Sequence, residues 1–382
     1  VSPVRIGISA FAGDAGKSGI GQYLINIIKR LPLMSDKDSF VVFCPRSAVE
    51  DLQLTNPRLE LVTTPDWMEK PVFSILWHLI ALPVMLKRHR CECVFLPAGN
   101  RRLGWWYPVP SVGTVHDLSQ LHVKGKYDRF RMYYVCNLLP RFMRRLTSVI
   151  SVSNATRQDL VSHAMVDPEK IRVIANGFDH LRFIGKDRVK AAALVKDSYG
   201  ASTPYLLYVA RLEHPGKNHV GLLKAFAILK AEGIPHQLVL AGSRWNGAEF
   251  IEETVEKLGL TKDVKFTGFV SNEMLPELYA GADLFVFPSL FEGFGIPLLE
   301  SMMSGTPVCA SDASSIPEVL GDAGLLFDPN DPRSIASSIR KVLDDPEVYA
   351  ALRQAGKQRA SGFSWEASAS QVLDTLHLAV KS

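Results

Sequence analysis

Pro288-Ser289-Leu290-Phe291-Glu292-Gly293-Phe294-Gly295-Ile296-Pro297-Leu298-Leu299-Glu300 is the stretch that decides the fold. The apolar run just before it, 284–287, predicts a buried parallel strand. The glycines then predict a tight turn, and the proline falls in the first turn of a helix, where proline is preferred. A helix that begins directly after a strand directs its free N–H groups and its dipole at an anion. Because Glu292 and Glu300 bracket the turn, the stretch predicts a phosphate cradle with a hydroxyl-binding carboxylate at each end, which suits a nucleotide sugar.

The same alternation of strand and helix continues outward in both directions. Apolar runs expected to be strands lie at 4–9, 40–44, 59–62, 94–96, 112–115, 149–151 and 172–174, and then at 205–210, 237–241, 264–267, 284–287, 307–310 and 325–327. Helical segments separate them, which predicts an α/β protein with two Rossmann-like, doubly wound parallel sheets. Because such sheets bind ligands at the carboxyl ends of their strands, two of them facing each other would form a cleft.

The length of 382 residues also indicates two domains, because one ordinary core does not grow that large. We place the first domain at 1–185 and the second at 204–362. Residues 186–203 lack strand character and are interpreted as the junction. The tail at 363–382 is expected to be a final helix.

Composition is that of a soluble globular protein, with 47% hydrophobic and 21% charged residues. The apolar stretch 71–86 is too short to span a membrane and contains His78 and Pro83, so it is interpreted as groove-lining or membrane-facing. The first residues enter a strand pattern without the features of a signal peptide. Five cysteines without metal-binding spacing indicate reduced thiols, and we expect a cytoplasmic protein.

The net charge of +4 conceals an asymmetry between the two halves. Residues 1–200 carry 28 Lys and Arg against 17 Asp and Glu, whereas residues 201–382 carry 15 against 22. A basic half indicates an anionic partner such as nucleic acid, anionic lipid or a phosphorylated substrate. A scattered, solvated basic surface is an equally good explanation at this point.

The glycine-rich segment 11–21 imitates two nucleotide-binding motifs and fits neither. A P-loop would need glycine where Phe11 stands, and the dinucleotide fingerprint would need glycine at Leu24. What remains is a turn in which the backbone of Gly19-Ile20-Gly21 can approach a phosphate. Asp36-Lys37-Asp38 has metal-binding spacing but reads as a solvated turn, so we expect no metal site.

Two further groups follow predicted strands at the edge where a ligand would bind. His116-Asp117 comes after strand 112–115, where an imidazole can bond a sugar hydroxyl; a structural histidine beside a capping aspartate fits equally well. Arg211 follows strand 205–210, and Lys217 precedes a helix. Two cations there suit a diphosphate leaving group, although alone they could be solvated surface charges.

The chain carries five motifs: Gly19-Ile20-Gly21, His116-Asp117, Asn176-Gly177-Phe178-Asp179, Arg211 with Lys217, and Glu292-x7-Glu300. With these motifs in this order, it resembles the retaining glycosyltransferases of family four, which have the GT-B fold. The resemblance covers nearly the whole chain and is dense from 204 to 330. It implies that the closing helix, which begins near Phe363-Ser364-Trp365-Glu366, crosses back to the first domain. It also implies a nucleoside-diphosphate sugar as co-substrate, with neither metal nor cofactor, because cations and helix N-termini replace them.

The resemblance implies a role for each matching residue. Glu300 would bind the ribose hydroxyls, and Glu292 would lie beside the donor sugar. Arg211 and Lys217 would stabilise the departing diphosphate, and His116 would contact the sugar near the reacting carbon. The remaining donor-binding residues would act largely through their backbone: Gly19, Gly21, Gly268, Val270, Gly293, Phe294 and Gly295.

The acceptor is expected on the basic first domain, as in the family. Aromatic faces that pack on sugar rings and arginines that suit lipid diphosphates mark candidates there: Trp77, His78, Arg101, Trp105 and Trp106. The segment 127–145 predicts a basic, aromatic amphipathic helix that can rest on an anionic membrane; core aromatics with a solvated basic edge explain it equally well.

We therefore expect a retaining hexosyltransferase that moves glucose or mannose from a UDP- or GDP-sugar to a saccharide or polyprenyl-linked glycan. The expected setting is exopolysaccharide or surface-polysaccharide synthesis at the inner face of the cell membrane, without nucleic acid. A nucleotide-sugar epimerase, a non-catalytic nucleotide-sugar or glycan-binding protein, and a P-loop ATPase are the competing hypotheses. Sequence does not decide between front-face displacement and a covalent intermediate on Glu292.

Overall fold

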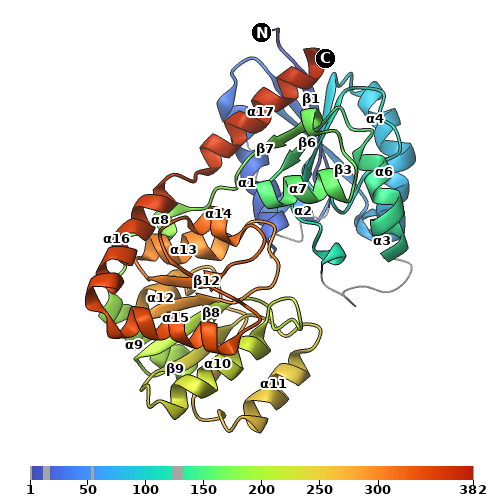
Figure 1. Cartoon of the computed structure of the whole chain (residues 1–382). Helices are drawn as coiled ribbons and strands as arrows, with labels where there is room; N and C mark the ends of the chain where they lie inside the picture. The colour runs from blue at the N-terminus through green and yellow to red at the C-terminus, as the bar shows by residue number, and fades with distance from the viewer. Residues whose placement is uncertain (1, 12–17, 53–55, 123–131, 382) are drawn as a thin grey trace. The chain divides into compact units, whose positions relative to one another are not determined.

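The computed structural model describes residues 2–11, 18–52, 56–122 and 132–381. The chain forms two compact units, residues 1–177 with 364–382 and residues 178–363. Each has a parallel sheet with helices on both faces (Figure 1). The predicted α/β fold with two doubly wound sheets is confirmed.

The first unit has a seven-stranded sheet in the order β3-β2-β1-β4-β5-β6-β7. Its elements are β1 (Arg5–Ser9), α1 (Gly19–Met34), β2 (Ser39–Pro45), α2 (Ala48–Leu52), β3 (Leu59–Thr64), η2 (Asp66–Glu69), α3 (Pro71–Leu76), η3 (Trp77–Ala81), α4 (Leu82–Arg88), β4 (Cys93–Leu96), β5 (Ser111–Val115), η4 (Ser119–Leu121), η5 (Tyr134–Leu138), α6 (Leu139–Met143), β6 (Ser148–Ser151), α7 (Asn154–Ser162), η6 (Pro168–Lys170), β7 (Ile171–Val173) and α17 (Trp365–Lys381).

The second unit has a six-stranded sheet in the order β10-β9-β8-β11-β12-β13. Its elements are α8 (His180–Phe183), α9 (Arg188–Tyr199), β8 (Tyr205–Val209), α10 (His219–Ala231), β9 (Gln237–Ala241), α11 (Ala248–Lys257), β10 (Val264–Gly268), α12 (Leu275–Gly281), β11 (Leu284–Phe287), α13 (Ile296–Ser304), β12 (Val308–Ser311), α14 (Ile316–Leu320), β13 (Leu325–Phe327), α15 (Pro332–Asp344) and α16 (Pro346–Ser361).

Two prolines explain an irregularity in the helices of the first unit. Leu82 and Leu139 each precede a proline, and each donates its N–H to a carbonyl five residues back, at Trp77 and Tyr134. Proline lacks an N–H and clashes with the preceding turn of an α-helix, so the wider π turn relieves the crowding. The segment 71–88, which contains the apolar stretch, is therefore α3, a π turn and α4.

The junction predicted at 186–203 is wrong, because most of it is helix α9 inside the second unit. This helix packs against α12, where a Cβ added to Gly281 would lie only 3.1 Å from the backbone of Ala192. The absence of strand character was interpreted as a linker, although the segment is helical. The chain passes from the first unit to the second at Gly177 and Phe178.

The last helix, α17, belongs to the first unit and packs against α1. Its start lies on the backbone of Gly177, where an added Cβ would come within 2.1 Å of the Trp365 nitrogen. Ser368 donates from α17 to the carbonyl of Ala175 at 2.7 Å. A side chain at position 177 would therefore displace the start of α17 from the first unit.

In the part of the chain that the structure describes, no helix is both long and apolar enough to cross a bilayer.

Candidate active site

The centre of the second sheet is a topological switch point, because β8 pairs with β9 on one side and β11 on the other. Ligands of doubly wound sheets bind outside the carboxyl ends of the strands at such a point. The loop after β8 carries Arg211 and Lys217, and the loop after β11 carries Glu292. Arg211, Lys217 and Glu292, which were predicted from the sequence, therefore lie on both sides of the switch point.

Hydrogen bonds tie these two loops together. The Leu290 N–H donates to the Gly216 carbonyl at 3.0 Å, and the Asn218 side-chain amide donates to the Pro288 carbonyl at 3.1 Å. The buried Tyr208 hydroxyl donates to the Lys217 carbonyl at 2.8 Å and lies 3.1 Å from Ser289 Oγ. Since both loops are fixed to each other, their functional side chains are held before a ligand arrives.

Lys217 and Glu292 form an ion pair, with Nζ 2.7 Å from Oε1. The two side chains are 22% and 14% exposed, so the pair is partly shielded but still open to solvent. Ser315 Oγ donates to the Glu292 carbonyl at 2.9 Å and contacts the Phe294 carbonyl at 3.0 Å. The carboxylate can hold the ammonium in place while its remaining N–H bonds face an incoming anion.

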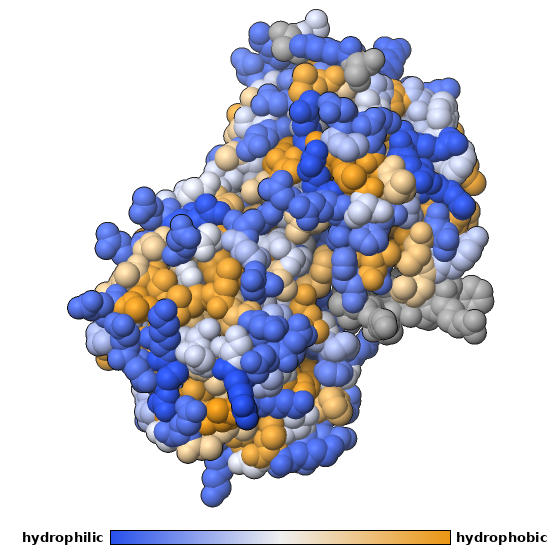
Figure 2. Space-filling view, viewed as in Figure 1, coloured by the Kyte–Doolittle hydropathy of each residue, from blue (hydrophilic) through white to orange (hydrophobic). Residues whose placement is uncertain are grey.

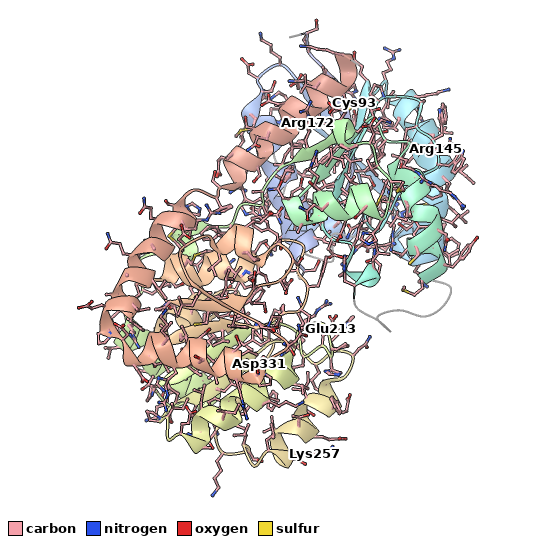
Figure 3. The ribbon with its side chains drawn as sticks, viewed as in Figure 1. Cys93, Arg145, Arg172, Glu213, Lys257 and Asp331 are labelled. Atoms are coloured by element: carbon pink, nitrogen blue, oxygen red, sulfur yellow. The ribbon has the colours of Figure 1, made fainter. Side chains whose placement is uncertain are left out.

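Arg211 is more exposed than Lys217 and is oriented by two neighbours. Its guanidinium lies 4.7 Å above the Trp245 ring and 3.2 Å from the carboxylate of Glu213, which Figure 3 labels. Stacking on an aromatic ring fixes the plane of a guanidinium and leaves its N–H edge available. The N–H edge of Arg211 that these contacts leave available can bind an anion such as a phosphate.

Helix α13 begins at Ile296 with Gly295 as its N-cap, at a φ of 105° that only glycine adopts readily. Pro297 lies in the first turn, as predicted. Phe294 is buried and packs edge-on against Phe363, with ring centroids 5.9 Å apart. Packing of Phe294 fixes the 293–295 turn, so the N–H groups at this helix end have a defined direction.

Glu300 lies one turn into α13, and the Tyr279 hydroxyl donates to its Oε2 at 2.9 Å. Burial raises the pKa of Glu300 to about 7, against the opposing effect of the Tyr279 hydrogen bond. A carboxylate that loses its water in this way gains more from new hydroxyl donors, such as those of a ribose.

Gly268 ends strand β10 with a φ of 67°, next to a register shift in the pairing with β9. Its carbonyl accepts from the Gly242 N–H at 2.9 Å. Val270 follows on the adjoining loop and is half-buried. Both lie at the carboxyl edge that also carries Arg211.

In the first unit, Gly19 and Gly21 occupy the first turn of α1, behind strand β1. The Gly21 N–H donates to Ser18 Oγ at 3.2 Å, and a Cβ added to Gly19 would meet no atom within 4 Å. Gly19 therefore leaves open space at a helix N-terminus. The preceding residues 12–17 of the predicted turn lie outside the described residues.

His116 lies at the carboxyl end of β5 and is buried. Its Nε2 is 2.8 Å from the Pro97 carbonyl, and its ring packs edge-on against Tyr23 at 4.7 Å. Burial lowers the pKa of His116 to about 4, although the Pro97 carbonyl and Asp117 oppose the effect. A neutral ring that donates from Nε2 leaves Nδ1 as an acceptor for a hydroxyl.

The structure corrects the expectation that Trp77 and His78 contact an acceptor. Both are buried, at 6% and 1% exposure. His78 is already bonded to Ser9 Oγ at 2.9 Å and to the Ser74 carbonyl at 2.6 Å. Burial lowers the pKa of His78 to about 4. These residues belong to the core, because the helix turns this face toward the sheet.

The other acceptor candidates do not share one site. Arg101 follows β4 and adds to the electrostatic lowering of the His116 pKa, so it lies at the carboxyl edge. Trp105 and Trp106 line a groove with Ser111, where β5 begins, and therefore lie at the amino edge. Trp105 and Trp106 therefore lie at the opposite edge of the sheet from Arg101 and His116, so the candidates do not form a single site.

Two residues that position the site were not predicted from the sequence. Tyr208 holds Lys217, and Tyr279 holds Glu300. They occur in apolar or ordinary helical surroundings, so no local pattern distinguishes them from core residues. A tyrosine in an otherwise aliphatic buried strand is the one available signal, since a buried hydroxyl needs a partner.

Solved structures with the same architecture cover nearly the whole chain. HepE from Anabaena in complex with UDP and glucose aligns with a TM-score of 0.74 at 24% identity, over 98% of this chain and 100% of that one. Sucrose-phosphate synthase from Thermosynechococcus elongatus aligns with a TM-score of 0.77 at 22% identity, over 99% of this chain and 100% of that one. The fold is therefore that of the GT-B glycosyltransferases.

Sequence comparison places the chain within that class. The model of glycosyl transferases group 1 matches residues 196–359, and the model of glycosyltransferase family 4 matches residues 17–182. The chain belongs to the group 1 glycosyltransferases of family 4. It is 28% identical to O-antigen chain mannosyltransferase B of Escherichia coli over 94% of this chain and 96% of that protein. It is 30% identical to the serotype-specific mannosyltransferase WbdA of Escherichia coli over 75% of this chain and 34% of that protein.

Proposed function

We propose that this enzyme is a retaining mannosyltransferase that uses a nucleoside-diphosphate mannose to extend a bacterial surface polysaccharide. The Lys217–Glu292 pair at the switch point, beside the N-terminus of α13, is the observation that carries the proposal. The mannosyltransferase names of two relatives support mannose over glucose as the transferred sugar. We propose GDP-mannose as its donor. The acceptor is a saccharide or a polyprenyl-linked glycan.

In this proposal the site stabilises the charge that develops on the leaving diphosphate. Lys217, oriented by Glu292, and Arg211, oriented by Trp245, neutralise the phosphate oxygens together with the N–H groups at the start of α13. Because these groups are fixed beforehand, they cost little reorganisation in the transition state. No metal ion is needed for this step, and transfer should persist in excess EDTA.

The ion pair also favours one of two retaining mechanisms. A covalent intermediate would require the Glu292 carboxylate to attack the anomeric carbon, but its Oε1 is engaged by Lys217. In front-face displacement, the leaving phosphate accepts the acceptor proton while Glu292 holds Lys217 and the sugar. Glu292→Gln keeps a hydrogen-bonding side chain and should retain measurable transfer, which a covalent nucleophile would not allow.

A thermal-shift panel of UDP-, GDP-, ADP- and dTDP-sugars tests the donor. Stabilisation by GDP-mannose above the other sugars is expected through linkage. Products are then analysed with GDP-mannose with and without an acceptor. An isomerised sugar without acceptor would indicate an epimerase, and nucleotide binding without any product would indicate a binding protein; either result would refute the proposal.

The surface of the first unit supports contact with an anionic membrane, where a lipid-linked acceptor would reside. One face of the α3–α4 segment bears exposed apolar side chains at helical spacing: Val72 at 68%, Phe73 at 44%, Leu76 at 45%, Ile80 at 65% and Val84 at 61%. Figure 2 shows apolar side chains at the surface of this unit among hydrophilic ones. We call these five residues the apolar stripe. An amphipathic helix of this kind can lie in the membrane interface.

Aromatic and basic side chains next to the apolar stripe fit the same membrane. Gly104 packs on the His78 carbonyl, which brings the following tryptophans to the helix. Lys87 lies 5.7 Å over the Trp106 ring, and Arg145, labelled in Figure 3, lies 3.6 Å over Trp105. Tryptophan and long basic side chains favour the headgroup region. The segment predicted for this role, 127–145, is described only from 132 onward, where it forms η5 and α6.

Flotation with vesicles tests this contact. The wild type should float with vesicles that contain anionic lipid and should lose binding as salt increases. The double variant Ile80→Glu/Val84→Glu should stay at the bottom of the gradient. Leu181→Glu, which alters an 86% exposed leucine of the second unit, is the matched control and should float. Failure of the wild type to float, or flotation of the double variant, would exclude the apolar stripe as the membrane contact.

A further inference from the structure

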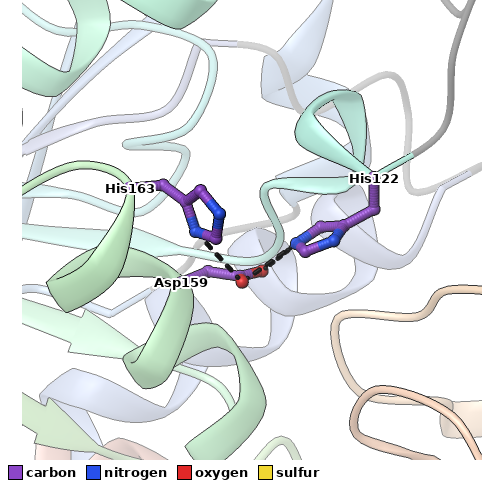
Figure 4. Close-up of side chains that lie close together, drawn as sticks. All are labelled: His122, Asp159 and His163. Carbon is purple, nitrogen blue, oxygen red and sulfur yellow. Dashed lines mark hydrogen bonds and ion pairs between the residues drawn. The ribbon is translucent and has the colours of Figure 1, made fainter.

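Three metal-ligating side chains meet in the first unit, apart from the residues assigned to donor binding. His122 follows η4 in the segment after β5, whereas Asp159 and His163 lie one turn apart on and just after α7. Figure 4 shows both imidazoles directed at the carboxylate. Because 37 residues separate His122 from Asp159, only the fold brings them together.

The geometry is close to that of a metal centre. His122 Nε2 lies 2.9 Å from each oxygen of Asp159, and His163 Nδ1 lies 3.6 Å from Oδ1. One ligand atom from each residue can be chosen so that all three lie within 4.8 Å of one another. Ligands bound to Zn²⁺ at about 2.0–2.2 Å are roughly 3–4 Å apart, so small ring rotations would complete the arrangement.

The exposure of the three groups also suits an ion. The Asp159 side chain is 11% exposed, whereas those of His122 and His163 are 36% and 46% exposed. Removing a carboxylate from water is costly unless it is paired, and a divalent cation is a strong partner. The exposed side leaves room for water or another ligand in the fourth position.

We propose that His122, Asp159 and His163 form a binding site for a divalent transition metal, with Zn²⁺ as the best match. Two imidazole nitrogens and one carboxylate favour Zn²⁺, Co²⁺ or Ni²⁺ over Mg²⁺ and Ca²⁺, which prefer all-oxygen ligands. The ion replaces the hydrogen bonds between His122 Nε2 and the Asp159 carboxylate. It also replaces the hydrogen bond between His163 Nδ1 and Ser162 Oγ, which are 3.0 Å apart.

The ion would clamp the segment after β5 onto α7. The same two elements already meet where Thr156 Oγ1 donates to the His116 carbonyl at 3.4 Å. A bound ion would add a further link, next to the edge that holds His116. It would therefore stabilise the folded first unit without taking part in transfer.

Equilibrium dialysis of Zn²⁺ and visible absorption of Co²⁺ test the site on the full-length protein purified without a histidine tag. The wild type should bind one ion, develop the d–d absorption of Co²⁺ with nitrogen ligands, and melt at a higher temperature as Zn²⁺ is added. His122→Ala and His163→Ala should each lower Zn²⁺ affinity at least tenfold, since loss of even an outer partner costs about 10–100-fold.

His89→Ala is the matched control, because His89 pairs with Glu60 at 2.9 Å without belonging to a three-ligand group among the described residues. This variant should bind Zn²⁺ as the wild type does. Folding of each variant is checked by circular dichroism, and the half-exposed His163 is the substitution best tolerated. The proposal is overturned if the wild type does not bind Zn²⁺ or Co²⁺, or if His163→Ala binds as tightly as His89→Ala.

Discussion

Glu300→Gln tests the role of the buried carboxyl group in α13. Burial raises the pKa of Glu300 to about 7, from an ordinary value of 4.5. The Tyr279 hydroxyl is its hydrogen-bond donor, and in the proposed complex the ribose hydroxyls would be further donors. Glutamine keeps the size and most hydrogen bonds of the side chain but cannot ionise.

The magnitude and sign follow from proton linkage. Between pH 4.5 and 7 the folded state holds a proton on Glu300 that the unfolded state has released, so the free energy of unfolding falls as pH rises. A shift from 4.5 to about 7 corresponds to roughly 3 kcal/mol of stability that is present below pH 4.5 and lost by about pH 7. Binding of the ribose should depend on pH in the opposite direction. It should strengthen as pH rises, because the ionised carboxylate is the better hydrogen-bond acceptor.

The assay is urea unfolding of wild type and Glu300→Gln at half-unit steps from pH 4.5 to 8. The stability of the variant relative to wild type should rise by about 2–3 kcal/mol across the range. The affinity for GDP should rise with pH in wild type and stay level in the variant. Glu253→Gln, at an exposed position of α11, is the control and should follow the wild type. A difference between wild type and Glu300→Gln that stays constant with pH would refute the reasoning.

Three other substitutions have definite expected outcomes. Tyr208→Phe removes the donor to the Lys217 carbonyl, so it should lower the free energy of unfolding in urea by about 1–2 kcal/mol and should also lower kcat. The control is Tyr205→Phe, because the Tyr205 hydroxyl donates to the Leu278 carbonyl; this variant should lose similar stability without loss of kcat. Equal effects of the two on kcat would argue against a positioning role for Tyr208. Gly177→Ala should destabilise the protein by about 1–3 kcal/mol, because its Cβ would overlap the backbone of Trp365. Gly362→Ala should cost far less, because its Cβ would meet only an ordinary van der Waals contact. Similar melting temperatures for the two variants would contradict the docking of α17 on Gly177. His116→Gln should lower the transfer rate but leave the shape of the pH–rate profile between pH 5.5 and 8 unchanged, since burial keeps the pKa of His116 near 4. A step in the wild-type pH–rate profile that disappears in the variant would show instead that the imidazole titrates in this range.

The fold was predictable because its signals are local. Short apolar runs between helical segments define a parallel sheet, and the predicted strands at 237–241, 284–287 and 325–327 match β9, β11 and β13 at both ends. Lys217 and Glu292 were also predictable as neighbours, since each follows a strand and the carboxyl ends of parallel strands share one edge. Their direct ion pair required the structure, because side-chain contacts depend on how the two loops are hydrogen-bonded.

The errors arose where burial is set by tertiary packing. Trp77 and His78 were predicted to contact an acceptor because aromatic faces pack on sugar rings, yet Trp77 is buried, and Ser9 and Ser74 satisfy the His78 imidazole inside the core. The His122–Asp159–His163 group was missed because His122 comes from a separate segment, and only the fold brings it to Asp159 and His163.

Isothermal titration of GDP and UDP into wild type and Lys217→Met, in excess EDTA, tests most directly whether the switch point of the second sheet binds the donor diphosphate. Wild type should bind GDP without metal, and Lys217→Met should bind it at least about tenfold more weakly, because a charge-assisted contact worth about 1.5–3 kcal/mol is lost. Lys257→Met, which removes an exposed lysine of α11, should bind like wild type. Equal affinity of wild type and Lys217→Met, or binding of neither nucleotide by the wild type, would contradict the proposed site.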